Sequence, residues 1–217
     1  HDLQDALQAT LTALLSKDAP SVSTIRMVQT LGRVLSANFN DKKTQTLVLD
    51  CLVSICLTNE GIEGLEKSPA TLNSVASELG SQSKGVRRTS MSILTLLAMK
   101  DSAGAAVVAP FSGAVAKCMT GHPHDQKMVQ DGLRIFRQLK RHTGSMEEGA
   151  EECLAELIRA WGRKGVVPSD SCHQEALDLL EICGLETFEL LLIGPEMPPG
   201  VVQVRARKPK PPGSDDN

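Results

Sequence analysis

A run of apolar residues at helical spacing, closed by a polar turn, recurs along this chain at a nearly constant interval. Four segments carry it: Leu52–Gly61, Ile93–Ser102, Leu133–His142 and Leu177–Cys183. The first three start about 40 residues apart, and the fourth follows after about 44. One such segment is too short to bury its apolar face alone, so neighbouring copies must stack against each other. The recurrence predicts an all-α fold, a right-handed α-solenoid.

Helical periodicity extends over most of the chain, with Gly, Pro, Asn and Asp clusters between the periodic segments. Asn59–Gly61 is expected to end a helix, because Asn and Gly favour helix C-termini. Ser68 is expected to cap the next helix, with Pro69 at its first position. The expected helices are Leu3–Lys17, Ser23–Ala37, Thr44–Leu57, a short piece up to Leu65, Pro69–Leu79, Lys84–Met99, Ala103–Val108, Phe111–Met119, Asp125–Lys140, Met146–Trp161, Ser171–Cys183 and Leu185–Leu192.

The composition supports helix-on-helix packing. The chain has no Tyr, one Trp and four Phe, so aliphatic side chains must fill the core. Aromatic and β-branched residues in period-two alternation, which are typical of sandwiches and barrels, are absent except in the short segment 201–208. A sheet-based fold is therefore not expected.

The charge balance and the hydropathy pattern exclude two classes of partner. The net charge is −3, so no overall positive field attracts nucleic acid. No apolar stretch reaches the roughly 18 to 20 residues needed to cross a bilayer, and no signal segment opens the chain. We therefore expect a cytoplasmic protein without membrane insertion. The chain begins with His1 and not with Met, so we expect a fragment or a processed piece of a longer protein.

Cysteine usage fits a reducing compartment. None of the six cysteines stands in a CxxC pair, and most fall inside apolar helical runs. Buried free thiols behave as small apolar side chains. The six are therefore interpreted as packing residues: Cys51, Cys56, Cys118, Cys153, Cys172 and Cys183.

The repeat length is that of armadillo and HEAT units, and the region 23–183 resembles armadillo-type repeats. Part of it, about 55 residues long, is similar to the armadillo-like regulatory region of diaphanous-type formins. The residues that carry this similarity are Cys51, Leu52, Asn59, Gly61, Leu65, Leu72, Leu79, Arg87, Arg88 and Ile93–Leu97. After Pro110 the chain departs from the formin pattern, and the armadillo domains of myosin chaperones and of cargo adaptors fit about as well.

These resemblances imply a non-catalytic scaffold that binds a peptide or partner domain in the groove of the solenoid. The formin resemblance implies the alternative, a regulatory module of a cytoskeletal protein that binds a small GTPase or an autoinhibitory helix. No cofactor is implied by either, and the oligomeric state stays open.

Basic residues cluster on the helices expected to line the concave surface of the solenoid. Arg134, Arg137 and Arg141 share one helical face. Together with the neighbouring cluster they are interpreted as a strip that accepts an acidic peptide or a GTPase switch region. The alternative is an ordinary solvated surface. The candidate partner-binding residues are Lys84, Arg87, Arg88, Arg134, Arg137, Lys140 and Arg141.

Two short motifs have both a functional and an ordinary interpretation. Arg87–Ser90 matches the pattern read by basophilic kinases, although its helical periodicity favours an ordered segment. His122 and His124, with Asp125 and Cys118 nearby, offer metal-ligand side chains. Their spacing around a proline is poor for chelation, so a loop in which Asp125 caps the next helix is the preferred interpretation.

Motifs of catalysis are missing. The chain has no GxSxG, HExxH, GxxxxGK[ST] or GxGxxG sequence. The acidic pairs Glu147–Glu148 and Glu151–Glu152 lie at the start of an expected helix, where the helix dipole favours negative charge. The sequence therefore predicts that the protein is not an enzyme and holds no metal.

The end of the chain differs in composition. After Ile193 the sequence becomes rich in proline, glycine and basic residues. Pro209 and Pro212 form a PxxP pattern that could dock on an aromatic groove, but a flexible linker is the preferred interpretation. We therefore divide the chain into an armadillo-like helical repeat domain, 1–193, and a tail or linker, 194–217.

Overall fold

The computed structural model describes residues 21–38 and 40–143, together with positions 157, 172, 175, 176, 178 and 179. Within these residues every regular element is a helix, which confirms the all-α prediction for this part of the chain. The elements are α2 (Ser21–Ala37), α3 (Lys42–Cys56), α4 (Asn59–Glu66), α5 (Pro69–Ser77), η1 (Glu78–Gly80), α6 (Lys84–Lys100), α7 (Ser102–Val108), η2 (Ala109–Phe111), α8 (Ser112–Gly121) and α9 (Gln126–Thr143).

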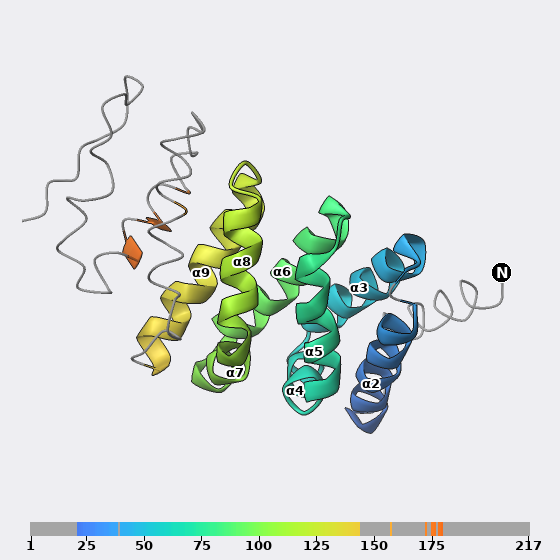
Figure 1. Cartoon of the computed structure of the whole chain (residues 1–217). Helices are drawn as coiled ribbons and strands as arrows, with labels where there is room; N and C mark the ends of the chain where they lie inside the picture. Colours follow the sequence, from blue (N-terminus) through green and yellow to red (C-terminus); the bar gives the residue numbers. More distant parts are fainter. Residues whose placement is uncertain are drawn as a thin grey trace, which may run out of the picture.

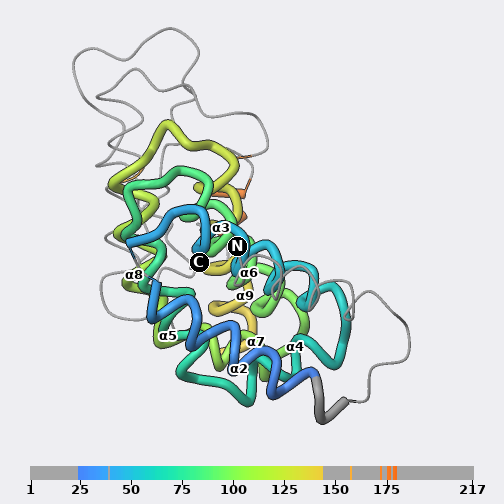
Figure 2. Tube along the Cα trace, turned by 90° about the vertical axis from the view of Figure 1, so that its right-hand side faces the viewer, coloured from blue at the N-terminus to red at the C-terminus, as the bar shows by residue number. Residues whose placement is uncertain are grey.

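Two groups of three helices follow one another with the same order of lengths. The first triplet, α4, α5 and α6, has 8, 9 and 17 residues, and the second triplet, α7, α8 and α9, has 7, 10 and 18. The elements succeed each other across the molecule from α2 to α9 (Figure 1). In the perpendicular view α3, α6 and α9 fall close together, with α5 and α8 to one side (Figure 2). Helix α6 packs against both α3 and α9, so the long helices form one row.

The corners between a long helix and the following short helix share one local design. Thr58 caps α4 by accepting a hydrogen bond from the Gly61 N–H at 3.1 Å, and Asp101 caps α7 by accepting one from the Gly104 N–H at 2.9 Å. A Cβ on Gly61 would lie 2.0 Å from the Ile55 carbonyl oxygen. The expectation that Asn59–Gly61 ends a helix is therefore wrong: the side-chain cap and the close approach of the glycine start α4 there.

Only half of the cap predicted for α5 is observed. Pro69 occupies the first turn of the helix as predicted, and Ser68 holds the N-cap position. The Ser68 hydroxyl makes no capping bond, however, and is buried without a hydrogen-bond partner. The fixed φ of proline and the Leu72 N–H to Ser68 carbonyl bond at 3.2 Å define this turn instead.

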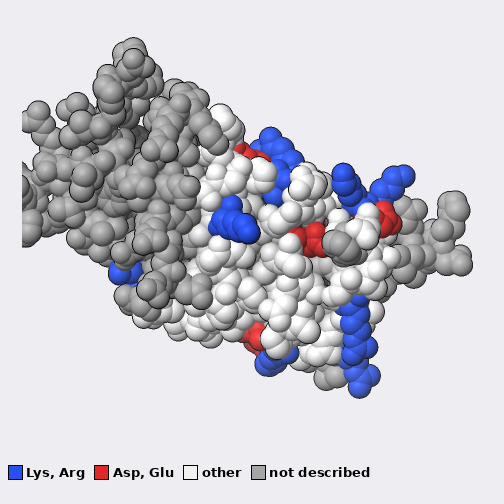
Figure 3. Space-filling model, viewed as in Figure 1, with Lys and Arg blue, Asp and Glu red and all other residues white. Residues whose placement is uncertain are grey.

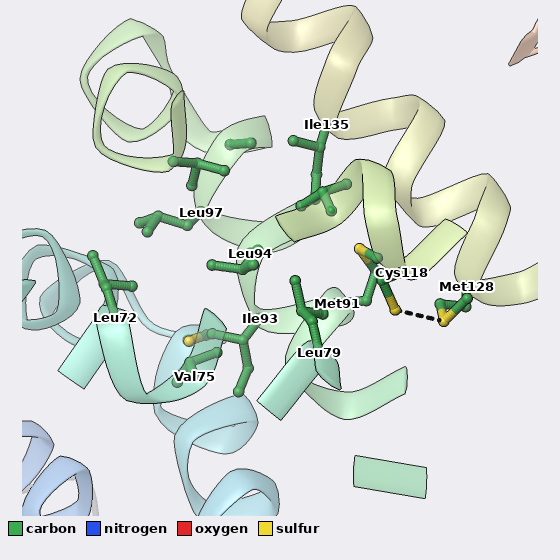
Figure 4. Close-up of a cluster of buried hydrophobic side chains, with 14 of the residues drawn as sticks. Leu72, Val75, Leu79, Met91, Ile93, Leu94, Leu97, Cys118, Met128 and Ile135 are labelled. Carbon is green, nitrogen blue, oxygen red and sulfur yellow. Dashed lines mark hydrogen bonds between the residues drawn. The ribbon is translucent and has the colours of Figure 1, made fainter. Parts of the chain in front are cut away.

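The core is a continuous set of aliphatic and sulfur-containing side chains. Leu94 and Leu97 of α6 are fully buried at its centre, between Leu72 of α5 and Ile135 of α9 (Figure 4). The four described cysteines form no disulfide among themselves and are buried, as expected for packing residues: Cys51, Cys56, Cys118 and Cys172. Burial raises the pKa of the Cys118 thiol to about 11, which keeps it protonated and unreactive at neutral pH.

The stretch Ser102–Gly121 is an exception to the expectation drawn from hydropathy. It is the one stretch of the described residues whose length and composition would suffice to cross a membrane. In the structure it comprises α7, η2 and α8, with Pro110 in the middle, and 44% of its most apolar 18 residues are buried inside the protein. Apolar residues such as Val108, Val115 and Met119 belong to the core, which explains its high hydropathy.

Predicted helix boundaries agree with the observed ones to within about two residues for α2, α6 and α7. The expected helices Leu3–Lys17, Met146–Trp161 and Leu185–Leu192, the acidic pairs of 147–152 and the tail 194–217 lie essentially outside the described residues. Within the expected helix Ser171–Cys183, the five described positions are helical.

Candidate protein-binding face

The first basic cluster lies in the first turns of α6, where an aspartate of the next triplet meets it. The Arg88 Nη2 is 2.6 Å and its Nε 2.8 Å from the Asp125 Oδ1. Lys84, whose side chain is 62% exposed, approaches Asp125 to 4.0 Å. Arg88 and, more weakly, Lys84 are therefore engaged by a carboxylate of this chain.

Asp125 has two structural tasks. It precedes α9, and its carboxylate accepts a hydrogen bond from the Met128 N–H, which confirms the predicted helix cap. Burial alone would raise the pKa of this carboxyl. The hydrogen bond from Arg88, the charges of Arg88 and Lys84, and the Met128 N–H outweigh burial and hold the pKa below its ordinary value. Asp125 is therefore ionised at neutral pH.

Arg87 differs from its neighbour because it points into the protein. It is only 7% exposed, and its Nη1 donates a hydrogen bond of 2.7 Å to the Ser81 carbonyl oxygen. Its Nε is buried without a partner. Arg87 therefore does not share the solvated surface of Lys84 and Arg88.

The second basic cluster lies on α9 and meets the helical positions near residue 175. Arg137 Nη1 is 2.8 Å from Glu175 Oε2, and Arg134 Nε is 3.0 Å from Glu175 Oε1. Arg137 also contacts Asp178 at 3.4 Å. These two arginines join α9 to the following helical segment of this chain. Lys140 is half-buried, whereas Arg141, in the last turn of α9, is exposed.

The predicted basic residues thus form two groups, and four of the seven face carboxylates of the protein itself: Lys84, Arg88, Arg134 and Arg137. The face of the molecule that carries α5 and α8 offers little charge (Figure 3). Helix α5 has no charged residue, and Ser102–Gly121 has one, Lys117. The row of long helices therefore offers a charged partner more charged side chains than this face does.

Sequence reasoning missed the most exposed apolar side chains. Among the described residues, the large hydrophobic side chains that are exposed are Leu57, at 73%, and Met99, at 49%. Leu57 caps the C-terminus of α3, and Met99 lies in the last turn of α6, 42 residues later. A further step of 42 residues leads to the exposed Arg141 of α9. The equal spacing of 42 residues between Leu57, Met99 and Arg141 was the sequence signal that could have identified these positions.

Hydrogen bonds fix the register of α9 against α6. Ser92 Oγ and Asp131 Oδ2 are 3.3 Å apart, and Thr95 Oγ1 donates to the Asp131 carbonyl oxygen at 3.3 Å. Helix α6 packs against both α3 and α9, and Leu57, Met99 and Arg141 stand at the C-terminal ends of these helices. These three residues define what we term the terminal face.

The two remaining motifs have ordinary structural roles in the described residues. Ser90 is fully buried in α6, so a kinase could reach its hydroxyl only after local unfolding. The Cys118 thiol donates to the Met128 sulfur at 3.3 Å (Figure 4). No group of three or more His, Cys, Asp or Glu side chains within the described segments is arranged to hold a metal ion.

Comparisons with known proteins give no family for this chain. No family model matches it, and a search of curated proteins finds no match. The similarity to armadillo repeats and to the formin region is therefore a prediction from the sequence pattern.

Proposed function

We propose that this protein is a right-handed α-solenoid of armadillo-like repeats and a non-catalytic interaction scaffold. It binds a peptide or a partner domain on the row formed by α3, α6 and α9. The two triplets, with their matching corners at Gly61 and Gly104, support the repeat interpretation. The architecture supplies an extended row of helices, which is the surface that such proteins use for binding.

The observation that carries the proposal is the exposure of Leu57 and Met99 at corresponding positions of neighbouring long helices. Exposed apolar side chains that lie close together mark interaction sites more often than scattered ones do. Arg141 adds a solvated positive charge at the next position of the series. A partner with apolar side chains followed by an acidic group would complement this terminal face.

A regulatory module similar to that of diaphanous-type formins is the second candidate. Its partner would be a small GTPase or an autoinhibitory helix, and the apolar and basic character of the terminal face suits either. Dependence on the bound nucleotide separates a GTPase from every other partner. A test must therefore include the nucleotide as a variable.

The experiment is an affinity capture with the full chain as bait, with and without a non-hydrolysable GTP analogue. The test bait carries Leu57→Ser and Met99→Ser, and the control bait carries Arg26→Ser and Arg33→Ser at exposed positions of α2. Circular dichroism first establishes that all baits have the same helix content. We expect the main partner to be lost from the test bait alone.

Equal capture by all baits would contradict binding through the terminal face. A partner that appears only with the GTP analogue would identify the regulatory module. A partner that ignores the nucleotide would favour the peptide-binding scaffold. Charge reversal by Arg141→Glu then measures the contribution of the positive end of the face.

A further inference from the structure

Gln45 and Arg87 occupy corresponding places in α3 and α6, 42 residues apart, and both are buried. In the first case the polar side chain has a buried acceptor. The Gln45 Nε2 donates to the two carboxylate oxygens of Glu78 at 2.9 and 3.0 Å. A carboxylate at the start of η1 therefore satisfies the polar side chain of α3.

The second triplet lacks this carboxylate. The buried residues Leu72 and Val75 of α5 correspond to Val115 and Cys118 of α8, 43 residues later. The same step from Glu78 leads to Gly121, which is exposed. A Cβ built on Gly121 meets no atom within 4 Å, so a side chain has room to begin at this position.

Within the described part of the chain, Arg87 has no carboxylate partner. Its Nη1 is bound to the Ser81 carbonyl oxygen directly after η1, and η1 packs against α8. Its charge also acts on Cys118 and on His122, three residues before Gly121 and one after it, so the guanidinium lies at this end of α8. No carboxylate of the described residues forms an ion pair with it, and Asp125 is bound by Arg88. A buried guanidinium whose Nε lacks a partner is costly, and a carboxylate ligand would remove that cost.

We propose that Arg87, beside Gly121, is a binding site for one carboxylate group. The carboxylate comes either from a Glu or Asp side chain of a partner protein or from a small free carboxylic acid. Two donors of a guanidinium suit the two oxygens of a carboxylate, and Glu78 shows that this place in the first triplet accepts one. The site lies at the opposite end of α6 from Met99 and does not depend on the terminal face.

The first test supplies the carboxylate within the full chain. Gly121→Glu is compared with Gly121→Gln, which has the same size without the charge, in the natural chain and in an Arg87→Gln background. We expect the glutamate variant to unfold about 3 °C higher than the glutamine variant. In the Arg87→Gln background this difference should vanish, or reverse because of the C-terminal helix dipole. Equal midpoints in both backgrounds would overturn the proposal.

The second test adds the carboxylate from outside. The NMR signal of the Arg87 Nε–H, assigned with Arg87→Gln, is followed while glutarate or N-acetylglutamate N-methylamide is titrated into the full chain. We expect a saturable shift that Gly121→Glu abolishes. Saturation by the glutamate derivative alone identifies a protein side chain as ligand, whereas saturation by glutarate identifies a free acid. No shift with either probe, or a shift with phosphate only, would contradict the carboxylate site.

Discussion

The two places where a long helix packs on the following triplet, which we term seams, have different polar contacts. In the first seam, between α3 and the first triplet, the amide of Gln45 meets the buried carboxylate of Glu78. In the second seam, between α6 and the second triplet, Arg88 forms an ion pair with Asp125, and Asp131 bonds Ser92. Similar helices therefore pack in similar order around unlike polar contacts.

The difference shows which features the packing requires. Apolar side chains and the close approach of the corners recur in both seams, because the row cannot form without them. The polar contacts vary, since any pair that satisfies buried donors and acceptors suffices. We therefore expect the two seams to respond alike to steric changes and in opposite directions to pH.

The largest effect is expected at the corners. Gly61→Ala and Gly104→Ala each place a methyl group near 2.0 or 2.1 Å from a carbonyl oxygen of the preceding long helix. Each should lower the free energy of unfolding by about 3 kcal/mol, because α4 or α7 must shift away. Chemical denaturation measures this loss.

Gly85→Ala is the matched control, since its new methyl group would lie 3.9 Å from the nearest atom, the Ser83 Oγ. It should be neutral or stabilise α6 by about 0.5 kcal/mol. A corner variant as stable as Gly85→Ala would show that the two corners do not constrain the row.

The ion pair of the second seam comes next. Asp125→Asn keeps a good cap for α9 but loses the charge that binds Arg88, and should cost about 2 kcal/mol at neutral pH. The pKa of Asp125 is lowered in the folded protein, so its contribution is fully present above the unfolded value of about 3.9. That contribution is lost as the pH falls through the folded pKa.

Unfolding free energies measured between neutral and acid pH should therefore converge for the natural chain and Asp125→Asn. Asp125→Ala, which also removes the cap, should cost about 1 kcal/mol more at all pH values. A constant difference between Asp125→Asn and the natural chain across this range would mean that the ion pair adds no stability.

Glu78 should show the opposite response. Burial raises the pKa of this carboxyl, and the hydrogen bond from Gln45 only partly offsets the effect. The folded protein then binds the proton more tightly than the unfolded chain does. Below the pKa of the unfolded chain the carboxyl is protonated in both states, and ionisation costs no stability. Above the pKa of the folded protein the full cost is present. Glu78→Gln should stabilise the protein by about 0.5 kcal/mol at neutral pH and by less at low pH. Destabilisation at neutral pH would show that the charged bond with Gln45 dominates.

The sequence predicted the helices well because their apolar residues follow one period. Predicted and observed starts of α6 coincide at Lys84, and the all-α class follows from the same pattern. The error at Asn59–Gly61 has a physical cause, since Asn and Gly also suit a helix end. Only the cap by Thr58 and the close contact of Gly61 with Ile55 distinguish a start from a stop.

The candidate site was predicted less completely than the fold. Spacing on a helix indicates that Arg134 and Arg137 share a face, but Glu175 is distant in the sequence and its pairing with them depends on the fold. Arg87 and Arg88 are neighbours of the same type, yet one is buried and one is bound to Asp125. Adjacent residues on a helix point in different directions, so composition alone could not separate them.

The smallest effect is expected for an ion pair that belongs to neither seam. Glu63 and Lys67 are 3.6 Å apart at the end of α4, with side chains 56% and 62% exposed. Lys67→Ala should change the free energy of unfolding by less than about 0.5 kcal/mol, because water and salt screen an exposed pair. The measurement is the same chemical denaturation, repeated at high salt. A loss as large as that of Asp125→Asn would show that burial does not make the Arg88–Asp125 pair stronger than an exposed pair.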